Sequence, residues 1–172
     1  GGYAPCVMSF GSDQVRGLEY VYSLRNSLDI AAVNMSLGGG YYSSACDSRA
    51  PAIASVIDRL TSAGIAVVIA AGNSGMNGYI SYPACIRNAI AVGSSNKNDG
   101  LSGFSNHSTL IDLVAPGERI TAGVPARSIK AMRGTSMAAP HVAGAFALLR
   151  SYDPNASVAS LWTALTCTGE PI

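Results

Sequence analysis

The sequence predicts an α/β fold in which a parallel β-sheet is flanked by helices. Helical segments alternate with short, continuous apolar segments, which is the pattern of buried parallel strands joined by crossover helices. Hydrophobic residues make up 48% of the 172 residues and charged residues only 12%, so apolar side chains are plentiful enough to fill a core between such layers. There is no internal repeat, linker or low-complexity tract, and a single domain over residues 1–172 is the simplest account.

The first half of the chain predicts two helices, each followed by a buried strand. The expected order is a helix at residues 15–28, a strand at 30–37, a helix at 50–63 and a strand at 65–71. The first helix has apolar side chains close to a period of about 3.6 residues, whereas both strands are short and mainly apolar. Pro51 suits the first turn of the second helix and Gly64 its end.

The second half is less regular and ends in two helices. A Gly/Asn/Ser loop is expected at residues 72–82, followed by strands at 89–92, 110–114 and 119–123. A long helix of small residues is expected at about 136–152, and a shorter one at about 158–165 with Ser157 as its N-cap.

Composition excludes several classes of protein. The formal net charge is 11 − 10 = +1 and the cations are scattered singly, so no basic surface for a nucleic acid is expected. The high hydrophobic content excludes a disordered chain. The longest apolar run, residues 65–71, is far shorter than the roughly 20 residues of a membrane-spanning helix.

The four cysteines, Cys6, Cys46, Cys85 and Cys167, are widely spaced, with no CxxC motif and no nearby histidine. This argues against a zinc site and favours disulfides in an exported protein, although four cysteines allow three pairings. Buried free thiols in a cytosolic domain are the alternative. Residues 1–5 show no signal-peptide pattern and read like the middle of a longer chain.

The most informative segment is residues 133–145, which contains Ser136 at the start of a predicted helix. The unpaired N–H groups and the positive end of a helix favour negative charge that develops beside such a serine. Gly134 lets the backbone approach a ligand, and Pro140 leaves the carbonyl of Ser136 without its usual helical partner. The alternative is that Ser136 only caps the helix.

Neither histidine suits the role of a base for Ser136. His141 lies five residues further along the helix, roughly 140° around its axis, and so faces away. We expect His141 to be packed and hydrogen-bonded, and His107 to be exposed in a polar loop.

Two further segments lie where the first two predicted strands end. Asn73, on a glycine-framed turn, offers an amide donor for an oxyanion, or simply stabilises the turn. The glycine spacing there is not that of a dinucleotide-binding loop. Three glycines at 38–40 leave a strand edge on which an extended peptide can pair, or form a flexible turn.

Three motifs in this order closely resemble the subtilisin-like serine proteases: Val33-Asn-Met-Ser-Leu-Gly-Gly, Ala70-Ala-Gly-Asn-Ser-Gly and Gly134-Thr-Ser-Met-Ala-Ala-Pro-His-Val-Ala-Gly. The resemblance extends over nearly the whole chain after Asp29. It implies the family's three-layer fold, a nucleophile at Ser136 and an oxyanion donor at Asn73.

The resemblance also implies a binding site for a peptide or protein substrate. The matching substrate-pairing edge comprises Ser36, Leu37, Gly38 and Gly39. The opposite wall of the pocket, for the residue before the cut, matches Ala70, Ala71 and Gly72, and Ser81 should lie near the base. A small residue at the base would admit a large side chain.

The family's triad runs in the chain order Asp, His, Ser, and no motif for the first two is present here. Residues 1–5 resemble a stretch that follows the catalytic histidine in relatives. The chain therefore looks like the C-terminal two-thirds of a catalytic domain, with its base and acid in an absent N-terminal part. The link from Gly1 to the first helix looks short for the family, which affects the rim near residues 10–14. Alone, these residues are expected to be almost inactive, because a serine without its base is a poor nucleophile.

By the same resemblance, Cys46 and Cys85 are the favoured disulfide pair, Cys6 with Cys167 less so, and the protein is expected to be exported. No cofactor is assigned: calcium stabilises many relatives, but no acidic cluster here has the density of a calcium site. Two other functions stay open. One is a non-catalytic peptide-binding module that uses the glycine edge, and the other is a self-sufficient hydrolase that uses His107.

Overall fold

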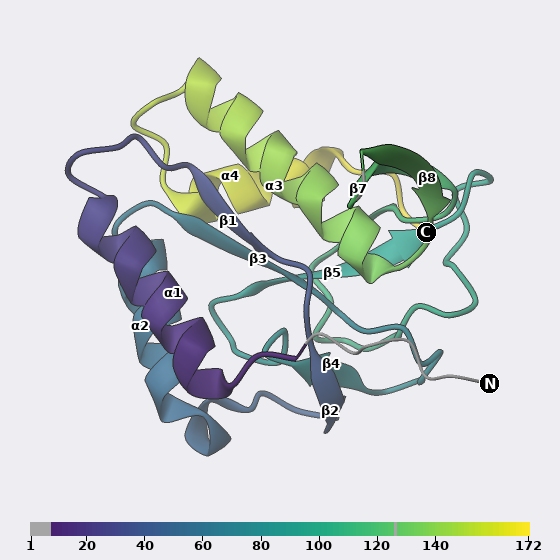
Figure 1. The fold of residues 1–172 in the computed structure, drawn as a ribbon. Helices are drawn as coiled ribbons and strands as arrows, with labels where there is room; N and C mark the ends of the chain where they lie inside the picture. Colours follow the sequence, from purple (N-terminus) through teal and green to yellow (C-terminus); the bar gives the residue numbers. More distant parts are fainter. Residues whose placement is uncertain (1–7, 126) are drawn as a thin grey trace.

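The structure, a computed structural model, describes residues 8–125 and 127–172. A four-stranded parallel sheet with the strand order β1-β3-β5-β6 lies between two layers of helices (Figure 1). The sheet consists of β1 (Ala32–Met35), β3 (Ala66–Ala70), β5 (Ile90–Ser95) and β6 (Leu113–Pro116). The predicted α/β class with a helix-flanked parallel sheet is therefore confirmed.

The two helical layers bury opposite faces of the sheet. One layer holds α1 (Gly11–Leu24) and α2 (Pro51–Ser62), preceded by the short helix η1 (Asp47–Arg49), and the other holds α3 (Thr135–Tyr152) and α4 (Val158–Thr168). The central strand β3 is buried along its whole length. Its Val67 and Ile69 pack in the core with α1 and α2, and Val68 packs on the other side against α3. A strand buried on both faces reads as a continuous apolar run, which is why this strand was recognisable in the sequence.

Two antiparallel strand pairs lie outside the main sheet. Strand β2 (Gly39–Tyr42) pairs with β4 (Ile80–Tyr82), and β7 (Ile120–Val124) pairs with β8 (Ser128–Met132). No strand was expected at β2, β4 or β8. Glycines and exposed side chains in β2 and β8 remove the apolar pattern on which a sequence-based strand assignment depends.

Several predicted boundaries are wrong by a few residues. Helix α1 begins at Gly11 rather than at residue 15, because its first turn is polar, and it ends at Leu24, where a turn at residues 25–28 begins. The predicted cap of α4 is confirmed: the Ser157 hydroxyl accepts a hydrogen bond from the Ser160 N–H, with 3.1 Å between Oγ and N.

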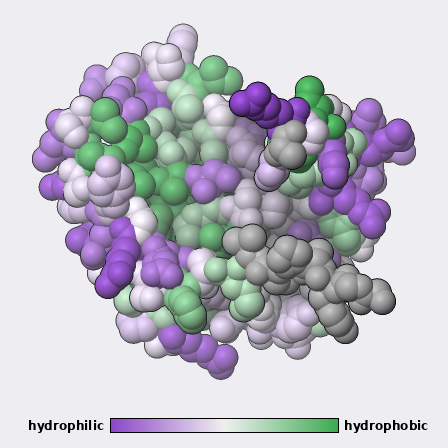
Figure 2. Space-filling model, in the orientation of Figure 1, coloured by the Kyte–Doolittle hydropathy of each residue, from purple (hydrophilic) through white to green (hydrophobic). Residues whose placement is uncertain are grey.

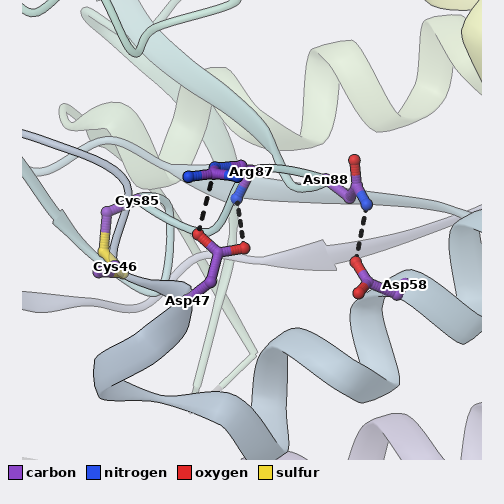
Figure 3. Close-up of polar contacts among 6 residues, drawn as sticks. All are labelled: Cys46, Asp47, Asp58, Cys85, Arg87 and Asn88. Atoms are coloured by element: carbon purple, nitrogen blue, oxygen red, sulfur yellow. Dashed lines mark hydrogen bonds and ion pairs between the residues drawn. A yellow bond between two sulfur atoms is a disulfide. The ribbon is translucent and has the colours of Figure 1, made fainter.

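A disulfide joins Cys46, just before η1, to Cys85, just after β4 (Figure 3). It confirms the favoured pair. Beside it, the Arg87 N–H donates to Asp47, and Asn88 Nδ2 donates to Asp58 of α2 at 2.7 Å. Cys167 is exposed, and Cys6, the partner that was less favoured for it, lies outside the described residues, as do residues 1–5.

We expect loss of this disulfide to lower the free energy of unfolding by about 3 kcal/mol, because the cross-link closes a long loop and restricts the unfolded chain. The two cysteines are 39 residues apart in sequence. Urea unfolding of a Cys46→Ser/Cys85→Ser variant would measure the loss. A Cys167→Ser variant is the matched control and should unfold like the parent. A loss below about 1 kcal/mol would contradict the expectation.

The carboxylate of Asp112 lies between the sheet and α4. Its Oδ2 accepts a hydrogen bond from the Ala91 N–H at 2.7 Å, and Trp162 of α4 contributes a second. Burial raises the pKa of Asp112 above its ordinary value of 3.8, and the two hydrogen bonds only partly offset this effect.

The raised pKa predicts how stability depends on pH. The folded state binds the Asp112 proton more tightly than the unfolded state, so its contribution is complete below the ordinary pKa and is lost as pH rises through the folded-state pKa. An Asp112→Asn variant keeps an acceptor for Ala91 without the charge. Its stability relative to the parent should therefore increase from pH 3.5 upward and level off above the folded-state pKa, as measured by urea unfolding across that range. A difference that is constant with pH would contradict this.

Candidate active site

One cavity of about 390 Å³ brings together most of the residues singled out in the sequence. It lies at the carboxyl ends of β1 and β3, where ligands of parallel sheets usually bind. Its lining comprises Ser36, Leu37, Gly38, Gly39, Gly40, Tyr41, Ala70, Gly72, Asn73, Ser74, Ser81, Thr135 and Ser136. Ala71 does not line the cavity: it is fully buried, and its carbonyl accepts hydrogen bonds from Ser81 and Asn106.

Ser136 is the second residue of α3 and lies at the edge of this cavity. The cap position belongs to Gly134, so the alternative that Ser136 is merely the N-cap is wrong. The N–H of Gly134 donates to the Gly117 carbonyl at 2.9 Å, which fixes the start of the helix. The hydroxyl of Ser136 thus lies in the first helical turn, where free N–H groups and the helix dipole favour an anion.

The amide of Asn73 is oriented by its neighbour Thr135. Asn73 Oδ1 accepts two hydrogen bonds, from the backbone N–H of Thr135 at 2.8 Å and from its hydroxyl at 3.0 Å. Because the oxygen is occupied in this way, the Nδ2 group is the free end of the amide. Nδ2 forms no hydrogen bond with the described residues and is available as a donor.

Gly134 leaves open the space in front of this donor. A Cβ built on Gly134 would lie 3.4 Å from Asn73 Nδ2 and 3.7 Å from the backbone nitrogen of Ser136. The nitrogen atoms of two donors therefore border one small volume that a side chain at this position would fill, together with Asn73 Oδ1 at 3.6 Å, which already accepts from Thr135. Two convergent donors beside a serine hydroxyl are the arrangement that stabilises the oxyanion of an acyl-transfer intermediate.

Two residues that the sequence analysis did not select hold the Asn73 loop in place. Thr135 is fully buried, and its hydroxyl also accepts a hydrogen bond from the Gly72 N–H at 3.1 Å. Asn106 is fully buried as well: its Oδ1 accepts from the N–H groups of Ser74 and Met76, and its Nδ2 donates to the Ala71 carbonyl. A buried asparagine cannot be recognised from its type alone, because most asparagines are exposed.

Ser81 lies between the two walls of the cavity. It is 6% exposed, and Cβ atoms built on Gly38 and Gly72 would approach its side chain to 3.3 and 2.3 Å, respectively. The walls also meet at the rim, where the Tyr41 and Ser74 hydroxyls are 3.4 Å apart. None of the lining residues is charged.

A second, groove-like cavity of about 540 Å³ continues from the first. It runs between residues 8–14 and the wall at residues 36–40. The glycine segment is thus less open than expected, because Gly39 already pairs with Tyr82 of β4. The wall of the groove nevertheless retains four exposed residues, Ser36, Gly38, Gly39 and Gly40.

Neither histidine is hydrogen-bonded to Ser136. His141 Nδ1 lies 2.7 Å from the Met137 carbonyl, so the expected hydrogen bond is present, but the ring is exposed rather than packed. His107 is exposed, as expected. Among residues 8–125 and 127–172, no three His, Cys, Asp or Glu side chains are grouped so that they could hold a metal ion. No helix in the described part of the chain is long and apolar enough to cross a membrane.

Comparison with known proteins gives consistent results. The family model described as "Subtilase family" matches residues 7–169. Subtilisin DY of Bacillus licheniformis is 38% identical over 157 residues, which cover 90% of this chain and 53% of that protein. The major intracellular serine protease of Bacillus subtilis (strain 168) is 42% identical over 136 residues, which cover 77% of this chain and 40% of that protein.

Among solved structures, a cold adapted subtilisin-like serine proteinase matches with a TM-score of 0.79 and 30% identity, over 93% of this chain and 55% of that chain. The chain thus spans about half the length of the relatives that it matches. It belongs to the subtilase family.

Proposed function

We propose that this chain carries the nucleophile and the oxyanion site of a serine endopeptidase. Ser136 attacks the scissile carbonyl, and Asn73 Nδ2 and the Ser136 N–H stabilise the oxyanion of the tetrahedral intermediate. The observation that carries the proposal is the orientation of Asn73, whose oxygen is held by Thr135 at 2.8 and 3.0 Å while its nitrogen stays free beside Ser136. The substrate is a peptide or protein, with an uncharged side chain in the neutral cavity above Ser81.

We further propose that the general base and its orienting acid come from a segment outside these 172 residues. Within the described residues, the hydroxyl of Ser136 makes its only hydrogen bond to the Ser36 carbonyl, at 3.4 Å. A serine needs a base to accept its proton, so the isolated chain should turn over peptides very slowly.

The edge of β1 is the proposed docking position for this segment. β1 pairs only with β3 among the described strands, so its other edge offers N–H and C=O groups to a further strand. A cavity of about 640 Å³ lies between β1 and α3, lined in part by Ala32, Ala143 and Ala147. Hydrophobic surface gathers over β1 in the middle of the face shown in Figure 2.

Labelling of Ser136 by a fluorophosphonate tests both proposals, because this reagent modifies serines that have a working base. We would compare the 172-residue chain with a fusion that places before it the part of Subtilisin DY preceding the matched region. The expected result is rapid, stoichiometric labelling of the fusion at Ser136, read by intact mass and peptide mapping, and none of the chain alone. A Ser136→Ala fusion is the control.

The other outcomes are equally informative. Rapid labelling of the chain alone would show that a base lies within it, and His107→Ala would then test the self-sufficient hydrolase. A folded fusion that is not labelled but binds an extended peptide, with an affinity that Ser136→Ala does not change, would replace the peptidase with a peptide-binding module.

We also propose that the protein is exported. The disulfide between Cys46 and Cys85 supports this, because such bonds persist in oxidising compartments and are rare in the cytosol. Detection of the protein inside the cells of its native host, with both thiols reduced, would contradict it.

A further inference from the structure

Pro140 creates a vacant hydrogen-bond position in the first turns of α3. Proline has no N–H, so the carbonyl four residues earlier loses its helical partner. In α3 (Thr135–Tyr152) that carbonyl belongs to Ser136, the proposed nucleophile. The carbonyl of the reacting residue is therefore open to a donor from outside the helix.

The donor is the side chain of Ser36, which lies 100 positions away in the sequence. Ser36 Oγ donates to the Ser136 carbonyl at 2.7 Å. Ser36 directly follows β1 and belongs to the wall of the peptide groove. This hydrogen bond therefore connects the wall of the groove to the helix that carries the nucleophile.

Asn34 directs the Ser36 hydroxyl toward this carbonyl. Asn34 Nδ2 donates to Ser36 Oγ at 2.9 Å. A hydroxyl has one proton and two lone pairs, so a bond accepted from Asn34 leaves the proton of Ser36 for Ser136. The result is a chain of hydrogen bonds that runs from Asn34 through Ser36 to Ser136.

Ser36 contacts Ser136 a second time through its own backbone. The Ser36 carbonyl accepts the 3.4 Å hydrogen bond from Ser136 Oγ. One residue thus holds both the backbone and the side chain of the nucleophile. The distance between the groove wall and the reacting oxygen depends on these two contacts.

From this geometry we infer that Ser36 is a positioning residue for the nucleophile and that Asn34 supports it. The Ser36 hydroxyl replaces the helical hydrogen bond that Pro140 removes, and so holds the first turn of α3 against the peptide groove. This inference rests on the proposed function for its catalytic consequence, but the hydrogen bond itself can be tested without any activity.

A double-mutant cycle with Pro140 provides that test. Pro140→Ala supplies an N–H to the Ser136 carbonyl within the helix and makes the Ser36 hydroxyl redundant. In urea unfolding of the 172-residue chain, Ser36→Ala should lower the folding equilibrium constant about fivefold when residue 140 is proline, and by less than about twofold when it is alanine. Equal losses in the two backgrounds would overturn the inference.

Labelling of the fusion protein by the fluorophosphonate tests the positioning role. Ser36→Ala should slow labelling of Ser136 about tenfold, Ser36→Thr should keep the parent rate because it retains a hydroxyl, and Pro140→Ala should restore the rate of the Ser36→Ala variant. Ser55→Ala is the control, because Ser55 is exposed on α2, on the opposite side of the sheet from α3, and makes no side-chain hydrogen bond with the described residues.

The two measurements separate the failure of each proposal. A labelling rate that Ser36→Ala leaves unchanged, or that Pro140→Ala fails to restore, would overturn the positioning role. If the fusion protein is not labelled at all, the proposed peptidase function fails, while a non-additive unfolding cycle would still establish the Ser36–Ser136 hydrogen bond.

Discussion

Replacing Gly72 with alanine is expected to lower the free energy of unfolding by about 4 kcal/mol, because the substitution combines backbone strain with a steric clash. Gly72 has φ +110, a conformation that other residues rarely adopt. A Cβ there would lie 2.3 Å from Ser81 Oγ and 2.4 Å from Asn106 Nδ2. Asn106 has no room to move, because it is buried and its side chain is hydrogen-bonded to three residues of the same loop, Ala71, Ser74 and Met76.

Gly78→Ala is the matched control for this variant. Gly78 also has a positive φ, +80, but no described atom lies within 4 Å of its Cβ position. The free energy of unfolding of Gly78→Ala should therefore fall only by the cost of backbone strain, about 1–2 kcal/mol. Urea unfolding of both variants gives the difference. Equal losses would show that the Asn73 loop can relax around a new side chain, contrary to the rigid packing described for it.

Removal of the Asn73 side chain should slow peptide hydrolysis by the fusion protein by about 10²–10³-fold in kcat, which is the effect known for the oxyanion-hole asparagine of a subtilisin. The reason is that Nδ2 interacts with charge that develops only in the transition state. KM should change little, since the ground-state carbonyl gains little from this donor.

Two substitutions at Asn73 separate its two roles. Asn73→Ala removes the oxyanion donor and also the acceptor for the buried Thr135, so it should lower both kcat and stability, the latter by about 1–3 kcal/mol. Asn73→Asp keeps the acceptor oxygen, so its stability should stay closer to that of the parent. Its kcat should fall at least as far as that of Asn73→Ala, because the donor is lost in both variants. An aspartate variant with the parent kcat would contradict the assignment of Nδ2 as an oxyanion donor.

The sequence carries most of the information about the main sheet and its helices. Strands such as β3 are buried on both faces, so their burial appears directly as an apolar run. Strands β2, β4 and β8 could not be predicted in the same way. The pairing of Gly39 with Tyr82 depends on segments 43 residues apart, and neither segment has the alternating pattern of an isolated hairpin.

The candidate site could be predicted only in part, for a comparable reason. Ser136 and Asn73 lie in distinctive local segments, and Pro140 indicated a carbonyl without a partner. Three further residues hold Asn73 and Ser136 in place: Thr135, Asn106 and the hydroxyl of Ser36. They are an ordinary threonine, asparagine and serine. Their roles depend on contacts with residues 35 to 100 positions away in the sequence, and no local sequence pattern predicts such contacts.

The edge of β1 with which no described strand pairs also governs how this chain behaves in concentrated solution. An unpaired strand edge offers free N–H and C=O groups to any other strand, and natural proteins usually protect it with charges or proline. The residues of β1, Ala32–Met35, include neither. Purified alone, the chain therefore has a built-in route to self-association, in which two copies pair edge to edge, and its sedimentation should depend on concentration until another strand occupies that position.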